Sequence, residues 1–114
     1  MAKEIKRVQS KGDAYDTNYH TVYTNSTSGP AMIIQVHISN DDNNDSVSAG
    51  IRIADSAGSN PLCLIANDVL VPSNDAIVDN TKYIINAGET LQFATGDTSQ
   101  NVWLNAVIVE GIND

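Results

Sequence analysis

The chain has 114 residues, 41% of them apolar and 18% charged, and its formal net charge is −8. This length suits a single domain that buries a core without disulfides or structural metals, and the lone Cys63 has no internal partner for a disulfide. No apolar run approaches the ~20 residues that a membrane span requires, and the acidic charge repels phosphate, so we expect neither a membrane nor a nucleic-acid partner.

The first twelve residues differ in charge from the rest. They hold four cations against one acid, a net charge of +3, whereas the remaining residues hold two cations against thirteen acids. The cations of this segment are Lys3, Lys6, Arg7 and Lys11. One interpretation is a solvated tail that contains lysines. The other is a basic arm, residues 1–12, that docks on an acidic surface of a neighbouring copy or of a larger scaffold, while residues 13–114 form the folded domain.

Regular alternation predicts a strand over residues 31–39, because apolar side chains recur at every second position. We expect the first of its two faces to be the core side, and that face holds Met32, Ile34, Val36 and Ile38. The opposite face holds Ile33, Gln35, His37 and Ser39.

Residues 101–110 alternate in the same way, and the expected core face is formed by Val102, Leu104, Ala106 and Ile108. The other face is also apolar towards its end, at Val107 and Val109. A strand with two apolar faces is either central in a sandwich or covered on its outer side by a partner.

Shorter strands are expected at residues 5–9, 21–24, 48–54, 62–66, 69–71, 82–85 and 90–95. Clusters of Asn, Ser, Gly and Pro lie between them and favour tight turns. Short strands at this spacing, without a convincing helical period, predict one all-β domain. We expect a single antiparallel β-sandwich or jelly roll of about eight strands with an extended N-terminal arm.

Few residues suit catalysis. His20 and His37 are the only imidazoles, and we interpret His37, on a polar strand face, as a solvated or hydrogen-bonded residue. Cys63 has apolar neighbours and is interpreted as a buried small hydrophobe rather than as a reactive thiolate. The sequence offers no coherent set of nucleophile, base and stabiliser, so we expect no enzyme activity and no cofactor.

The weak metal candidate is the acidic turn that contains Asp41, Asn43 and Asp45. Their spacing matches the first ligands of a calcium loop. The pattern then fails, because Ser46 stands in place of the glycine and Arg52 in place of the bidentate glutamate. Turns rich in Asp and Asn also form for purely conformational reasons, and both interpretations stay open.

The layout of strands and turns along the chain resembles that of the small β-sandwich virion proteins of tailed bacteriophages, namely head decoration (cement) proteins and tail-appendage modules. The resemblance covers most of the chain and lies in the order and spacing of these segments rather than in a signature motif. It is carried by Val22-Tyr23-Thr24-Asn25 before a Ser/Gly turn, by Val71-Pro72 before a polar stretch, by the turn Asn86-Ala87-Gly88-Glu89 that leads into Leu91-Gln92-Phe93-Ala94, and by a final strand that reaches Val107-Ile108-Val109-Glu110.

This resemblance implies a capsid decoration protein that binds the outer shell and bridges neighbouring major capsid subunits, often as a homotrimer. It also implies assembly in the host bacterial cytoplasm, where a lone cysteine suits the reducing conditions. The basic arm would clamp acidic patches on the shell or on a neighbour. Tyr83 and Trp103 are candidate aromatic anchors of such an interface, although a place in the core or on a sheet face suits Trp103 equally well.

Two other functions remain open. A tail, baseplate or fibre-associated module would use the same fold for assembly or host attachment, presenting loops such as residues 40–46 and 56–61. A free carbohydrate-binding sandwich would need an exposed aromatic platform, and aromatic residues make up only 5% of the chain.

Overall fold

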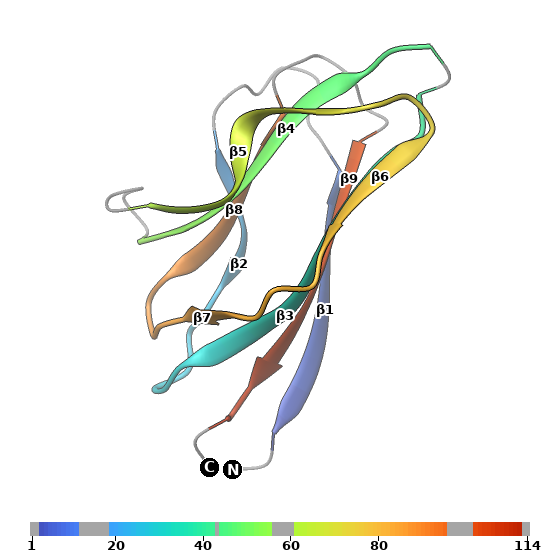
Figure 1. The fold of residues 1–114 in the computed structure, drawn as a ribbon. Coiled ribbons are helices and arrows are strands. Elements are labelled where there is room, and N and C mark those ends of the chain that lie inside the picture. The colour runs from blue at the N-terminus through green and yellow to red at the C-terminus, as the bar shows by residue number, and fades with distance from the viewer. Residues whose placement is uncertain (1–2, 12–18, 43, 56–60, 96–101, 113–114) are drawn as a thin grey trace.

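The computed structural model describes residues 3–11, 19–42, 44–55, 61–95 and 102–112, which form two facing antiparallel sheets (Figure 1). The strands are β1 (Glu4–Lys11), β2 (His20–Thr24), β3 (Ala31–Asn40), β4 (Val47–Ala54), β5 (Leu62–Val71), β6 (Asp75–Asp79), β7 (Tyr83–Ile85), β8 (Thr90–Thr95) and β9 (Val102–Glu110). The prediction of a single all-β antiparallel sandwich is confirmed. No helix in the described part of the chain has the length and apolar character that crossing a membrane demands.

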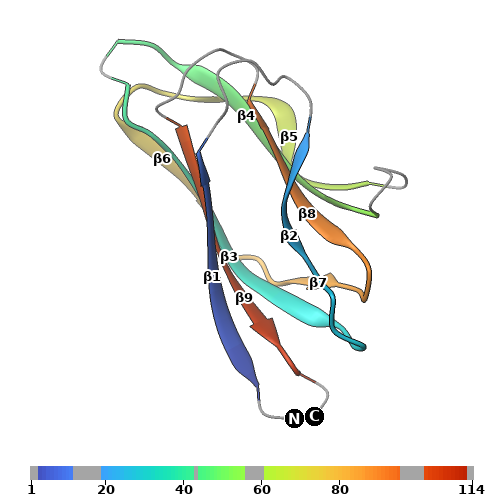
Figure 2. The same cartoon turned by 180° about the vertical axis from the view of Figure 1, so that it is seen from behind.

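Sheet A has the strand order β1-β9-β3-β6, with β7 also paired to β3, and sheet B has the order β2-β8-β4-β5. The chain therefore changes sheets six times, namely after β1, β2, β3, β5, β7 and β8. Seen from behind, β1 and β9 run side by side at one edge and face β2 and β8 across the interior (Figure 2). This arrangement places β1 at one edge of sheet A and β6 and β7 at the other, and makes β2 and β5 the edges of sheet B.

The core fills the space between the two sheets. It consists of apolar side chains that point inwards from alternate strand positions. The largest of those that are completely buried are Phe93, Ile33, Ile38, Ile51, Ile85, Leu91, Leu104 and Ile108. Because they come from both sheets, the two layers stabilise each other by removing apolar area from water.

The strand β9 confirms the pattern expected for the C-terminal segment. Val102, Leu104, Ala106 and Ile108 are buried, whereas the residues between them are half-buried on the other side of sheet A. β9 lies between β1 and β3, so it is central, and its outer face is apolar as well.

The expected core face of β3 is correct in its second half and wrong in its first half. Val36 and Ile38 are buried, but so is Ile33, while Met32 points to the outer side. The pairing of β3 with β9 shifts register between Ile33 and Gln35. Ile34 is the extra residue of this bulge, and one inserted residue moves all preceding side chains to the opposite face.

The N-terminal segment expected as an arm lies along the sheet as the edge strand β1. It pairs with β9 over its whole length, from Glu4 opposite Glu110 to Lys11 opposite Trp103. Val8 pairs with Ala106 and packs against the core. The side chains of β1 therefore alternate between the sandwich interior and the outer face of sheet A.

Candidate functional site

The described cations of the N-terminal segment lie on different sides of β1. Arg7 is exposed on the outer face of sheet A, where its register partner is Val107. Lys6 has the opposite parity, and its Nζ lies 3.1 Å from Glu110 Oε1. Lys3 is exposed just before the strand. These residues thus form no single cluster, because neighbouring positions of a strand face opposite sides.

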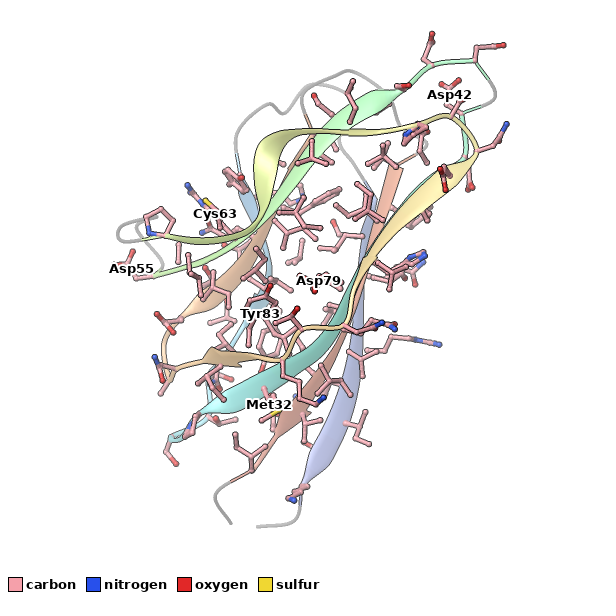
Figure 3. All side chains as sticks on the ribbon, viewed as in Figure 1. Met32, Asp42, Asp55, Cys63, Asp79 and Tyr83 are labelled. Atoms are coloured by element: carbon pink, nitrogen blue, oxygen red, sulfur yellow. The ribbon has the colours of Figure 1, made fainter. Side chains whose placement is uncertain are left out.

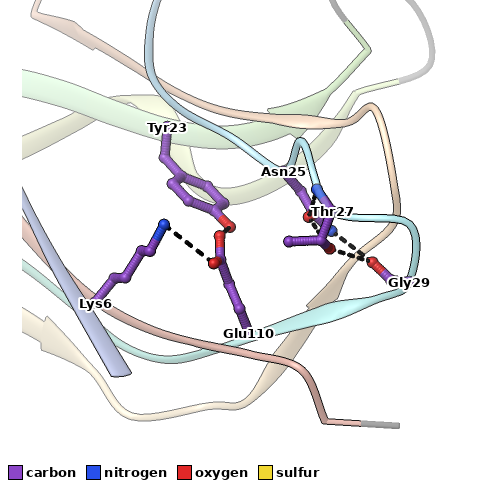
Figure 4. Close-up of polar contacts among 6 residues, drawn as sticks. All are labelled: Lys6, Tyr23, Asn25, Thr27, Gly29 and Glu110. Atoms are coloured by element: carbon purple, nitrogen blue, oxygen red, sulfur yellow. Dashed lines mark hydrogen bonds and ion pairs between the residues drawn. The ribbon is translucent and has the colours of Figure 1, made fainter. Parts of the chain in front are cut away.

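Glu110 joins the two sheets at the end of β9. It is only 6% exposed, and its Oε2 accepts a hydrogen bond from the Tyr23 hydroxyl of β2, while Lys6 of β1 approaches its other oxygen (Figure 4). A buried carboxylate needs such donors, because leaving it unpaired costs free energy. The contact of Lys6 with Glu110 was not foreseen from the sequence, since Lys6 was assigned to partner binding.

The same contacts shift two pKa values. Burial raises the pKa of Tyr23 far above its ordinary value, and its hydrogen bond to Glu110 acts in the same direction. The hydrogen bond from Tyr23 holds the pKa of Glu110 below its ordinary value, against the opposing effect of burial, and Lys6 contributes to this lowering. These contacts favour the charged form of Glu110 and the neutral form of Tyr23.

A second buried polar group, Asn25, holds the turns at the same end of the sandwich (Figure 4). Its Nδ2 donates to the carbonyls of Gly29 and Ile85, at 3.0 and 2.9 Å. Its Oδ1 accepts from both the backbone nitrogen and the hydroxyl of Thr27, and its own backbone carbonyl accepts from Gly88. Gly88 has a φ of 85°, a conformation that glycine adopts without strain.

The two candidate aromatic anchors occupy different surroundings. Tyr83 pairs with the buried Ile33, so both side chains lie on the inner face of sheet A, and Tyr83 packs against the core. Its hydroxyl donates to Asp79 Oδ2 at 2.8 Å, a bond that raises the pKa of Tyr83. Trp103 is half-buried on the outer face of sheet A, opposite Ser39. A role of either residue in binding a partner stays a prediction, and only Trp103 has the orientation that such a role needs.

The acidic turn between β3 and β4 is held by its own hydrogen bonds. Asn40 is buried, and its Nδ2 donates to the carbonyls of Asp45 and Val71. Asp42 Oδ1 accepts from the backbone nitrogens of Asn44 and Asp45. Asn43 of the metal candidate lies outside the described residues, and the described part of the chain contains no group of three or more His, Cys, Asp or Glu that could hold a metal ion.

Cys63 is exposed, so the expectation that it is buried is wrong. It pairs with Arg52 on the face of β5 that points away from the core. The other histidine, His20, points inwards. Its ring contacts Phe93 edge to face, with centroids 5.8 Å apart, and its Nε2 lies 3.3 Å from Ser10 Oγ.

The surface with the character of an interface is the outer face of sheet A. Four strands present one apolar residue each along a single row of paired positions, and these are Ile5, Val109, Met32 and Ile84. Ile5 is 74% exposed and Ile84 is 45% exposed. One sequence feature indicated this face, namely the apolar residues Val107 and Val109 on the second face of the C-terminal strand. The bulge in β3 hid the contribution of Met32.

Comparison with known proteins finds no matching protein-family profile and no similar curated protein, but several solved structures share the fold. A pentameric capsid protein isolated from metagenomic phage sequences is 16% identical with a TM-score of 0.51, over 90% of this chain and 59% of that chain. This chain therefore spans about three fifths of that protein's length. A chain of the acid-stable capsid of Helicobacter pylori bacteriophage KHP30 is 8% identical with a TM-score of 0.54, over 96% of this chain and 86% of that one.

The likeness also extends beyond viruses. A protein of the Bacillus endospore appendages, described as disulfide-linked pili, is 7% identical with a TM-score of 0.54, over 95% of this chain and 84% of that one. At these identities the likeness shows the fold, a β-sandwich of the kind found in viral capsid proteins, and leaves the function to the residues of this chain.

Proposed function

We propose that this chain is a structural protein of a phage virion, and specifically a capsid decoration protein that binds the outer shell and bridges neighbouring major capsid subunits. The observation that carries the proposal is the likeness of nearly the whole chain to a chain of a phage capsid, with little of either left unmatched. The absence of a coherent catalytic set in the sequence supports a structural role over an enzymatic one.

The distribution of charge supports attachment through the N-terminal segment. Lys3 and Arg7 are exposed on or next to an edge strand, whereas most acids of the chain lie elsewhere in the sequence. Such a cationic edge fits acidic patches on a shell or on a neighbouring copy. Each contact contributes modestly, and the sum over many copies on a shell is large.

A tail, baseplate or fibre-associated module is the second candidate. The described residues of the turn favour it, because Asn40 bonds the carbonyls of Asp45 and Val71, and Asp42 accepts from the backbone nitrogen of Asn44. A loop at the end of a sandwich suits the presentation of a binding surface. This role uses the same fold with fewer copies in each particle.

The copy number in purified virions separates these two roles. We expect quantitative mass spectrometry to find the protein in the particles at a stoichiometry comparable with that of the major capsid protein. A stoichiometry that matches tail proteins instead would favour the second candidate. Absence of the protein from purified particles would contradict both roles.

Attachment to shells also tests the proposed role of the cations. We expect the double variant Lys3→Glu/Arg7→Glu to bind isolated shells at least about tenfold more weakly than the wild type, and added salt to weaken wild-type binding because exposed charge pairs are screened over about 8–10 Å. The matched control is Lys82→Glu, a charge reversal at an exposed site outside the N-terminal segment. Binding that neither the double variant nor salt weakens would contradict attachment through the cations.

A further inference from the structure

The two outer faces of the sandwich differ in how far the chain itself covers them. In sheet B, Gln92 and Ala94 of the inner strand β8 have the opposite orientation to the core residues of that strand, yet they are only 5% and 0% exposed. Arg52 lies over this face, where its Nε donates to Gln92 Oε1 at 2.7 Å and its guanidinium carbon lies 4.0 Å from the centre of the Tyr19 ring. In sheet A the outward residues of the inner strand β9 are only half-buried. Within the described part of the chain, sheet A therefore presents the more open face.

This open face is apolar at the end formed by the start of β1 and the end of β9. Strand pairing aligns one row of apolar residues across four strands, namely Ile5, Val109, Met32 and Ile84. Arg7 and Val107 pair in the next outward row. We call these residues the sheet A patch. Figure 3 shows Met32 on β3 at this end of the molecule, well away from Asp42 at the other end.

The other exposed apolar side chains among the described residues form no comparable patch. Leu62 and Leu70 lie at opposite ends of β5, where Leu62 pairs with the buried Ile53 and Leu70 pairs with the outward Ser48. These two leucines therefore point to different faces. Val78 pairs with a polar residue of β3. The sheet A patch is thus the described surface on which exposed apolar residues adjoin one another.

The sheet A patch is also free of negative charge. Among the described strand positions of sheet A, every acidic residue lies on the inner face: Glu4 and Glu110 pair with each other, Asp75 pairs with the buried Asn40, and Asp79 pairs with the buried Val36. The patch itself carries the cation Arg7. In a chain of net charge −8, such a face fits a partner surface that is apolar and bears carboxylates. The acids elsewhere in the chain repel the same partner, so charge also orients its approach.

We propose that the sheet A patch is the face by which this protein docks on the capsid shell, against a shell surface that is apolar at its centre and bears carboxylates within reach of Arg7. The inference rests on the proposed virion role, and it adds which face is buried and what chemistry meets it. Sheet A then lies against the shell and sheet B points outwards. Ile5 and Ile84 are 74% and 45% exposed in the free protein, so their burial removes apolar area from water, while Arg7 fixes the orientation.

Thiol labelling on isolated shells tests this orientation, because the exposed Cys63 is a natural reporter on sheet B. We expect Cys63 to react with a maleimide at the same rate in free and in shell-bound protein. In Cys63→Ser/Ile84→Cys the thiol should react at least about tenfold more slowly on shells, because the centre of an interface excludes solvent. The matched control is Cys63→Ser/Leu70→Cys, which places the thiol at an exposed position of β5 and should keep its rate. Mass spectrometry of the labelled peptide measures each rate.

Binding affinity tests the chemistry of the contact. We expect Ile5→Thr/Ile84→Thr to bind shells at least about tenfold more weakly than the wild type, and the matched pair Leu62→Thr/Leu70→Thr to bind like the wild type. Amidation of the shell carboxylates should weaken the binding of the wild type more than that of Arg7→Gln, because this variant lacks the cation that meets them. Unchanged circular dichroism and Tm show that each variant is folded.

Three results would overturn the inference and leave the proposed virion role standing. They are an Ile84→Cys thiol that stays reactive on shells, equal weakening by the two threonine pairs, and an equal effect of amidation on the wild type and Arg7→Gln. Protection of the same thiol in free protein at rising concentration would assign the patch to a second copy and would also overturn the inference. Absence of the protein from purified virions would contradict the virion role itself, so the two failures are distinguishable.

Discussion

At the scale of single residues, buried polar side chains connect elements that the apolar core alone would leave less well oriented. Glu110 is the clearest case, because it accepts from Tyr23 of the opposite sheet and pairs with Lys6 of the neighbouring strand. Its pKa is lowered in the folded state, first by the hydrogen bond from Tyr23. A lowered pKa means that the charged form contributes to the stability of the fold.

This contribution is complete above the pKa of the unfolded chain, about 4.5, and is lost as the pH falls through the lower pKa of the folded state. We expect Glu110→Gln to lower the free energy of unfolding at pH 7 by about 1–3 kcal/mol. The difference from the wild type should shrink as the pH falls below about 4.5 and through the lower pKa of the folded state. Urea unfolding at several pH values measures it, and a difference that stays constant with pH would contradict the assigned role of the carboxylate.

Asn25 makes an equally specific prediction. Asn25→Ala leaves the buried carbonyl of Ile85 without its donor and removes the acceptor of Thr27. We expect a loss of about 2–3 kcal/mol in the free energy of unfolding. The matched control Asn86→Ala changes an exposed asparagine of the neighbouring turn and should stay within about 0.5 kcal/mol of the wild type.

At the scale of elements, β1 is both a strand of the sandwich and the carrier of the basic charge. Deleting residues 2–11 would uncover the edge of β9 together with the core beneath Val8. Such a deletion would therefore change stability and charge at once. Substitutions at outward positions of β1 separate the two effects, which is why the attachment test uses side-chain changes.

The inward and outward orientation of alternate side chains in β1 can be tested separately. We expect Val8→Ala to lower the free energy of unfolding by about 1–2 kcal/mol, because the side chain packs against the core. Gln9→Ala changes the exposed neighbour and should cost no more than about 0.5 kcal/mol. Chemical denaturation compares the two, and equal losses would contradict the inward orientation of Val8.

Sequence patterns predicted the long elements better than the irregular ones. The alternation of residues 102–108 identified β9 and its core face, because each apolar residue there sits at the expected position. The same reasoning failed in the first half of β3, because a pattern of alternating apolar residues does not show where a bulge inserts an extra residue, here Ile34. No strand was expected at β6, Asp75–Asp79, although it pairs with β3 over its whole length.

At the scale of the whole molecule, the sequence revealed that charge is unevenly distributed but not on which surface each charge lies. The segregation of acids from the outer face of sheet A depends on strand parity and register across β1, β9, β3 and β6, which follow from the tertiary pairing. The candidate site was predictable only in part for the same reason. Arg7 and Trp103 share this outer face, whereas Lys6 and Tyr83 point inwards.

The pairing of Glu4 with Glu110 has a mechanical consequence. Because β1 and β9 are antiparallel and adjacent, a force applied to the two chain ends acts on one end of a single ladder. Its hydrogen bonds lie across the strands, so such a force loads them one pair after another, as in opening a zipper. The sandwich would therefore yield easily to tension on its two ends. A force spread over its sheet faces would instead be resisted by all the packed side chains of the core together.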